Sequence, residues 1–184
     1  MRRLIMALLA CALLAGALSQ YAQTTPGGTP ARTLPDAAQI VQQFGPAFKP
    51  LPGFPVLTAD FDGDGAEDAV AVATAEDPLL DEAAFHYKVV DPYSSHFGIG
   101  DPRITRQFSA HQGPSPLVLV VHNWRTPKAK FVILNFPFDK LSLSRTLVKK
   151  KTVPAIRGEE LGGSRSVIYW DGKKWKWQDE GISD

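Results

Sequence analysis

The chain has little of the chemistry on which many enzymes and disulfide-rich proteins depend. Its 184 residues include a single cysteine, Cys11, which lies within an apolar N-terminal stretch. The rest of the chain therefore offers no thiol nucleophile and no disulfide bond. The formal net charge is only +1, which gives no reason to expect binding to nucleic acid or to an anionic membrane.

Sequence signatures of catalysis are also missing. The four histidines show no HxH, HExxH or H-x₃₋₅-H spacing, so no zinc site is indicated by the sequence; they are His86, His96, His111 and His122. The chain has no G-x-S-x-G nucleophile elbow and no phosphate-binding P-loop. An enzyme is therefore not the favoured interpretation, although residues assembled only by folding would escape such a search.

The N-terminus has the layout of a secretory signal peptide. Two arginines follow Met1, an apolar run extends from Leu4 to Leu18, and small and polar residues follow. The apolar run is about fifteen residues long, shorter than the roughly 20 that cross a bilayer as a helix. We expect residues 1–22 to be removed, leaving a periplasmic or secreted protein with no stable membrane anchor.

A flexible linker and a helix are expected next. Residues 23–34 are rich in Pro, Gly and Thr, which predicts a tether, and 35–184 are expected to form a single globular domain. Thr33 is the predicted N-cap of a helix that ends at Gly45. Its apolar face has i, i+3, i+4, i+7 spacing and comprises Ala37, Ile40, Val41 and Phe44.

The most informative stretch is an acidic loop of nine residues. Its carboxylates occupy positions 1, 3, 5 and 9, and they are Asp60, Asp62, Asp64 and Asp68. Carboxylates this close repel one another unless a cation lies among them. Gly63 and Gly65 supply the positive φ angles that a tightly curled loop needs. Calcium binds carboxylate and carbonyl oxygens, so we expect a calcium ion held by these residues and the carbonyl of Ala66.

The flanking residues identify the kind of loop. An EF-hand would need a Glu at position 12, where this chain has Ala71, and both flanks are β-like. The strand–DxDGDGxxD–strand pattern over residues 54–74 resembles the FG-GAP and VCBS-type repeat. The resemblance implies a calcium loop like those of integrin-like β-propellers. An Asp- and Gly-rich hairpin turn without metal remains the alternative.

The remaining pattern predicts mainly strands. They are expected over residues 68–74, 86–90, 117–121, 130–136, 141–148, 166–170 and 173–177. A propeller needs several similar blades, and no second DxDGDG occurs here. We therefore predict an α+β fold: a mainly antiparallel sheet built of hairpins with the N-terminal helix packed on it, containing a single repeat and not a full propeller.

The C-terminal part predicts a hairpin with a two-residue Asp171-Gly172 turn. Trp175 and Trp177 alternate with lysines, so one face of the second strand is apolar. Packing of these rings into the core is favoured over an exposed stacking platform.

Two functions stay open. The favoured one is an exported non-catalytic protein with one calcium-binding β-hairpin loop, acting as a binding or envelope-interaction module. The alternative is a periplasmic or extracellular hydrolase with its site under the 91–116 loop, which carries His96 and His111. A histidine paired with a carboxylate in a cleft would favour the hydrolase.

Overall fold

The computed structural model describes residues 34–99 and 116–182, and the expected signal peptide and most of the linker lie outside this part. The helices in it are α1 (Ala37–Gln42), α2 (Glu82–Phe85) and α3 (Pro92–His96). The strands are β1 (Lys49–Pro50), β2 (Leu57–Ala59), β3 (Asp68–Thr74), β4 (Tyr87–Val90), β5 (Pro116–His122), β6 (Lys130–Leu134), β7 (Lys140–Val148), β8 (Lys151–Glu159), β9 (Ser164–Trp170) and β10 (Trp175–Ile182).

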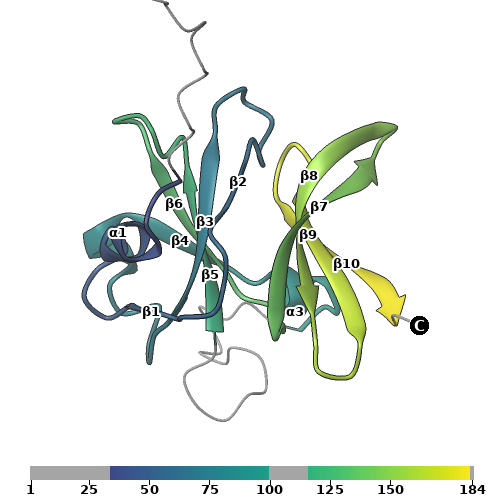
Figure 1. The fold of residues 1–184 in the computed structure, drawn as a ribbon, viewed down its shortest axis with the longest axis horizontal. Helices are drawn as coiled ribbons and strands as arrows, with labels where there is room; N and C mark the ends of the chain where they lie inside the picture. The colour runs from purple at the N-terminus through teal and green to yellow at the C-terminus, as the bar shows by residue number, and fades with distance from the viewer. Residues whose placement is uncertain (1–33, 100–115, 183–184) are drawn as a thin grey trace, which may run out of the picture. The chain divides into compact units, whose positions relative to one another are not determined.

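The strands form two sheets where the sequence predicted one (Figure 1). The six-stranded sheet has the order β1-β3-β5-β6-β4, with β2 also paired to β3. Its pairs are antiparallel except β4 and β6, which run parallel. The second sheet is an antiparallel β10-β9-β8-β7 meander. The structure confirms the predicted fold class in its broad features: mixed α and β, with mostly antiparallel strands and few helices.

The six-stranded sheet has a buried cluster on each face. On β3, the side chains of Ala69, Ala71 and Ala73 belong to one cluster, which also contains Ile40 and Val41 of α1. The intervening valines of β3 belong to the other cluster, together with Ile156 and Ile168 of the four-stranded sheet. Because successive side chains of a strand point to opposite faces, a continuous apolar run is what a strand buried on both faces requires.

Two local predictions need correction. The N-cap of α1 is Asp36, which accepts the N–H of Ala38 at 3.2 Å, and not Thr33. The β9–β10 turn has four residues, because Trp170 pairs with Trp175. Asp171 closes that longer turn, since its Oδ1 accepts the N–H groups of both Lys173 and Lys174. A carboxylate that satisfies two backbone donors favours this turn over the two-residue form.

No helix in the described ranges has both the length and the apolar character needed to cross a membrane.

Candidate metal site

The acidic loop connects the antiparallel strands β2 and β3, and the sequence also predicts a loop between two strands. Ala59 pairs with Asp68, so the loop comprises residues 60–67. Gly63 and Gly65 have φ angles of 76° and 89°. These values lie in the left-handed region that side chains other than glycine rarely adopt.

Backbone N–H groups of the loop turn toward its own carboxylates. Asp60 accepts hydrogen bonds from Gly63 N at 2.8 Å and Gly65 N at 3.0 Å. Asp62 Oδ1 accepts from Asp64 N at 3.2 Å, and Asp64 Oδ1 accepts from Ala66 N at 2.9 Å. These bonds hold the curl and fix the direction of each carboxylate.

The structure divides the predicted carboxylates into two groups that share one member. Asp60, Asp62 and Asp64 form the first, with one oxygen from each within 4.8 Å of the others. Asp62 also belongs to a second, more buried group with Asp68 and His122. Both groups have donor atoms close enough to hold a metal ion.

Asp68 anchors the base of the loop. Its side chain is fully buried, and its two oxygens accept different backbone N–H groups. Oδ2 accepts from Phe61 N at 2.8 Å and Oδ1 from Asn123 N at 2.9 Å. The carboxylate therefore ties the start of the loop to the β5–β6 connection.

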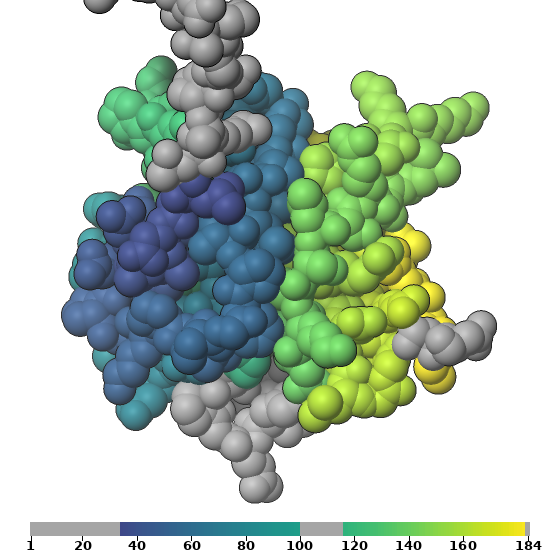
Figure 2. All heavy atoms as spheres, in the orientation of Figure 1, coloured from purple at the N-terminus to yellow at the C-terminus, as the bar shows by residue number. Residues whose placement is uncertain are grey.

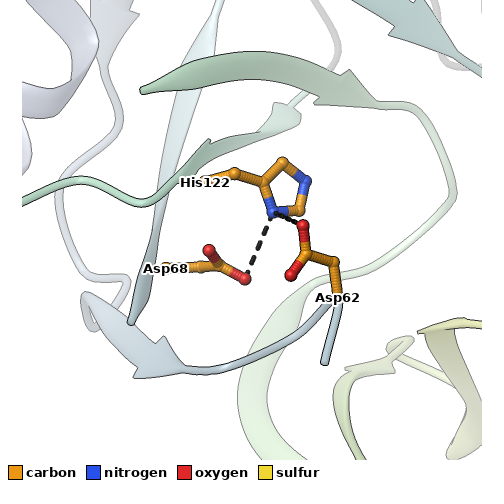
Figure 3. A group of neighbouring side chains, drawn as sticks. All are labelled: Asp62, Asp68 and His122. Atoms are coloured by element: carbon orange, nitrogen blue, oxygen red, sulfur yellow. Dashed lines mark ion pairs between the residues drawn. The ribbon is translucent and has the colours of Figure 1, made fainter. Parts of the chain in front are cut away.

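His122, the last residue of β5, is a site residue that the sequence did not reveal. Its side chain is only 5% exposed, and Nδ1 lies 3.3 Å from Asp62 Oδ2 and 3.2 Å from Asp68 Oδ2 (Figure 3). The pairing of β3 with β5 places Ala69 opposite Val121 and so brings the end of β5 to the acidic loop. Because this pairing joins distant segments, the only sequence signal was a histidine at the end of an apolar run.

The β5–β6 connection also holds the outer side of the loop. The side-chain amide of Asn123 donates to Asp64 Oδ2 at 2.9 Å. Trp124 Nε1 and Arg125 Nε both donate to Glu67 Oε2, at 3.3 and 3.0 Å. Arg125 also lies over the Trp124 ring, 4.4 Å from its centroid.

The carboxylates of the loop differ in their electrostatics. Burial, followed by the neighbouring charge of Asp68, raises the pKa of Asp62. The Ala66 N–H and then the Asn123 amide lower the pKa of Asp64, because both donors stabilise its ionised form. In the metal-free protein, the charge of Asp62 is thus the less well compensated of the two.

The loop borders a cavity of about 390 Å³. Asp60, Asp62 and Gly63 line this cavity, and so do Lys149, Lys151 and Trp170. The lysines come from the end of the β7–β8 hairpin, whose light-green residues project at the upper right of Figure 2.

Comparison of the chain with protein-family models, with curated proteins and with solved structures finds no match. The interpretation of the site therefore depends on its own geometry and on the sequence of the loop.

Proposed function

We propose that this chain is an exported, non-catalytic binding protein whose β2–β3 loop holds one calcium ion. The observation that carries the proposal is the convergence of Asp60, Asp62 and Asp64, whose oxygens lie within 4.8 Å of one another. Calcium binds oxygens at 2.3–2.6 Å, so ligands of one ion are never more than about 5 Å apart. The spacing of the three oxygens satisfies this limit.

The sequence of the loop suggests two further ligands. The carboxylate of Asp68 falls on a ligand position of the FG-GAP and VCBS-type motif, and the carbonyl oxygen of Ala66 is of the backbone type that calcium sites also use. A carboxylate oxygen has two lone pairs, so Asp68 Oδ2 can accept the N–H of Phe61 and still face a cation. Together with water, these groups provide the six or more oxygens that calcium prefers.

We propose further that the chain uses the motif once, in an α+β domain and not in a propeller. Helix α1 then serves as a cover for one face of the six-stranded sheet. The burial of Ile40 and Val41 in one cluster with the β3 alanines supports this arrangement.

We propose that a partner or ligand binds in the cavity beside the loop. A bound calcium ion would neutralise the acidic wall formed by Asp60 and Asp62. Lys149 and Lys151 line the same cavity, so a loaded site suits an anionic group of a partner or ligand. Trp170 adds an apolar surface against which such a ligand can pack.

Residues 100–115, most of the 91–116 loop under which a hydrolase site was expected, lie outside the described residues. A hydrolase is the second candidate for a different reason, because His122 lies beside two carboxylates. A general base must reach a substrate or a water molecule, whereas the side chain of this histidine is 5% exposed. In the described part of the chain, His122 Nδ1 has no hydrogen bond from a hydroxyl nucleophile. The non-catalytic role therefore agrees better with the geometry.

Calcium-dependent stability tests the proposal. The exported protein is treated with chelator, and its Tm is measured with and without about 10 mM Ca²⁺ or Mg²⁺, roughly tenfold above the weakest extracellular calcium sites. A ligand that binds only the folded form raises stability by RT ln(1 + [L]/Kd), which is about 1.4 kcal/mol at tenfold excess. We expect a clear rise with Ca²⁺ and a much smaller one with Mg²⁺.

Variants make the calcium test specific. Asp60→Asn removes a ligand charge but keeps one acceptor oxygen for the loop N–H groups, and it should abolish the rise. Asp179→Asn removes an equivalent charge from an exposed position of β10 and should leave the rise unchanged. If the Tm of the wild-type protein does not change with Ca²⁺, the calcium proposal is wrong and the loop is an acidic turn without metal.

Export is tested separately by N-terminal sequencing of the mature protein. We expect it to start at Gln20 or Gln23, after cleavage that follows Ser19 or Ala22. Retention of residues before Ala17 would contradict this part of the proposal.

A further inference from the structure

One buried nitrogen at the site lacks a hydrogen bond. His122 Nδ1 is enclosed, and no donor or acceptor in the described residues pairs with it in hydrogen-bond geometry. It nevertheless points at two carboxylates, lying 3.3 Å from Asp62 Oδ2 and 3.2 Å from Asp68 Oδ2 (Figure 3). Buried polar atoms normally have partners, so an atom of this kind aimed at two anionic oxygens needs an explanation.

We infer that Asp62, Asp68 and His122 form a second metal position, which takes a divalent transition metal of the zinc class. The three donor atoms, one nitrogen and two oxygens, lie within 4.8 Å of one another. Zinc–ligand bonds to His and carboxylate are about 2.0–2.2 Å, so ligands of a tetrahedral ion are about 3.3 Å apart. Both nitrogen–oxygen separations match this edge length.

The donor set distinguishes this position from the calcium loop. Calcium takes oxygen ligands, whereas imidazole nitrogen suits zinc, copper, iron and nickel. The outer group of Asp60, Asp62 and Asp64 contains only oxygen donors. The inner group of Asp62, Asp68 and His122 adds an imidazole nitrogen. The two positions therefore favour different metals, although the proposed calcium site also uses Asp62 and Asp68.

The surroundings hold the donors in place before any metal binds. The N–H groups of Phe61 and Asn123 fix both oxygens of Asp68, as expected for a preorganised ligand. The Trp175 ring packs against His122 with a centroid separation of 5.8 Å. Trp175 is itself buried and contacts Phe61, which places an apolar wall beside the donors.

The inference goes beyond the calcium proposal and does not require it. Neither Asp60 nor Asp64 belongs to the inner group, and the carbonyl of Ala66 is not needed. The two positions can therefore be tested with different variants.

The test uses the full mature chain after removal of metals by a chelator. Zn²⁺ is titrated by calorimetry, and Co²⁺ is added as a spectroscopic probe whose visible bands report a protein-bound ion. We expect one Zn²⁺ per chain and competition between Zn²⁺ and Co²⁺. Mutation of a residue that only supports a ligand costs about 10–100-fold in affinity, so loss of the ligand itself in His122→Gln should raise the Zn²⁺ Kd by at least about 100-fold. His96→Gln is the matched control, because this histidine is exposed at the end of α3, and it should stay within about twofold of wild type.

The outcomes separate the inference from the calcium proposal. Asp60→Asn should lose the calcium response and keep Zn²⁺ binding, whereas His122→Gln should do the reverse. Zn²⁺ binding unaffected by His122→Gln would overturn the inference. If His122→Gln does not fold, the wild-type protein still decides, since the absence of Co²⁺ bands at one equivalent would equally overturn it.

Discussion

Asp68 and His122 meet at one end of the β3–β5 pair, where Asp68 Oδ2 lies 3.2 Å from His122 Nδ1. One is the first residue of β3 and the other is the last residue of β5. Both side chains are buried, so the contact is formed where the sheet core ends and the acidic loop begins. The pairing of β3 with β5 therefore positions both Asp68 and His122 at the base of the acidic loop.

Asp68 should therefore matter for stability even without metal. Asp68→Ala leaves the N–H groups of Phe61 and Asn123 without their acceptor, and each unsatisfied buried group costs about 1–3 kcal/mol. We expect a loss of roughly 2–4 kcal/mol in the free energy of unfolding, measured by urea denaturation in chelator. Asp179→Ala, at an exposed position of β10, loses one exposed hydrogen bond from Gly181 N and should change it by less than about 1 kcal/mol. Equal effects of the two variants would contradict the anchoring role.

Asp62 and Asp64 should respond in opposite directions when each is neutralised in the metal-free protein. Burial and the charge of Asp68 raise the pKa of Asp62, so its folded-state contribution to stability is lost as pH rises through that pKa. The pKa of Asp64 is lowered instead, so its contribution is present above the unfolded value near 3.8 and is lost on acidification. At pH 7 in chelator, we expect Asp62→Asn to raise the Tm and Asp64→Asn to lower it. A shift of the same sign for both would contradict the opposite electrostatic roles of the two carboxylates.

The local geometry of the loop was predictable because it depends on neighbouring residues. Alternating aspartates and the positive φ angles of Gly63 and Gly65 are properties of a short segment. The same holds for the continuous apolar run of β5, whose burial on both faces its sequence anticipates. These features need no knowledge of which strands pair.

The inner group of Asp62, Asp68 and His122 was not predictable, because it depends on residues that are far apart in the sequence. His122 reaches Asp68 only because β5 pairs with β3, and α2, β4 and α3 lie between these strands in the sequence. Periodicity predicts a strand but not its distant partner, so histidine spacing alone gave no metal signal. The predicted length of the β9–β10 turn was wrong for a more local reason. Hydrogen bonds to the side chain of Asp171 favour the longer turn.

Gly158 of β8 should not tolerate a side chain. A Cβ at this position would lie 2.7 Å from Phe136 Cε2 and 3.1 Å from Phe138 Cβ, and both rings are buried. Overpacking of this kind costs about 1–3 kcal/mol, which thermal unfolding of Gly158→Ala should reveal. Gly162→Ala is the matched control, because a Cβ there meets nothing within 4 Å. An unchanged Tm for Gly158→Ala would mean that the aromatic pair moves aside without cost.

Tyr87 should make the fold sensitive to alkaline pH. Its ring is buried and packs against Phe44 and Phe48, and its hydroxyl donates to the carbonyl of Pro78 at 2.8 Å. Burial, and then the charge of Asp81, raises the pKa of Tyr87 to about 12. The folded state therefore keeps a proton that the unfolded chain releases near pH 10, so stability is fully present below pH 10 and falls as pH approaches 12.

Replacement of Tyr87 by phenylalanine separates the contribution of this residue to the pH dependence of stability from that of other groups. Tyr87→Phe loses one buried hydrogen bond and should cost about 1 kcal/mol at pH 8. It should also remove a decline of about 1.4 kcal/mol per pH unit between pH 10 and 12, since the ring can no longer ionise. Urea unfolding at several pH values measures both effects, and Tyr169→Phe, on half-buried β9, should keep the alkaline decline because Tyr87 is still present. Parallel pH profiles for wild type and Tyr87→Phe would rule out Tyr87 as the source, because lysines and other groups common to both proteins would then account for the whole decline.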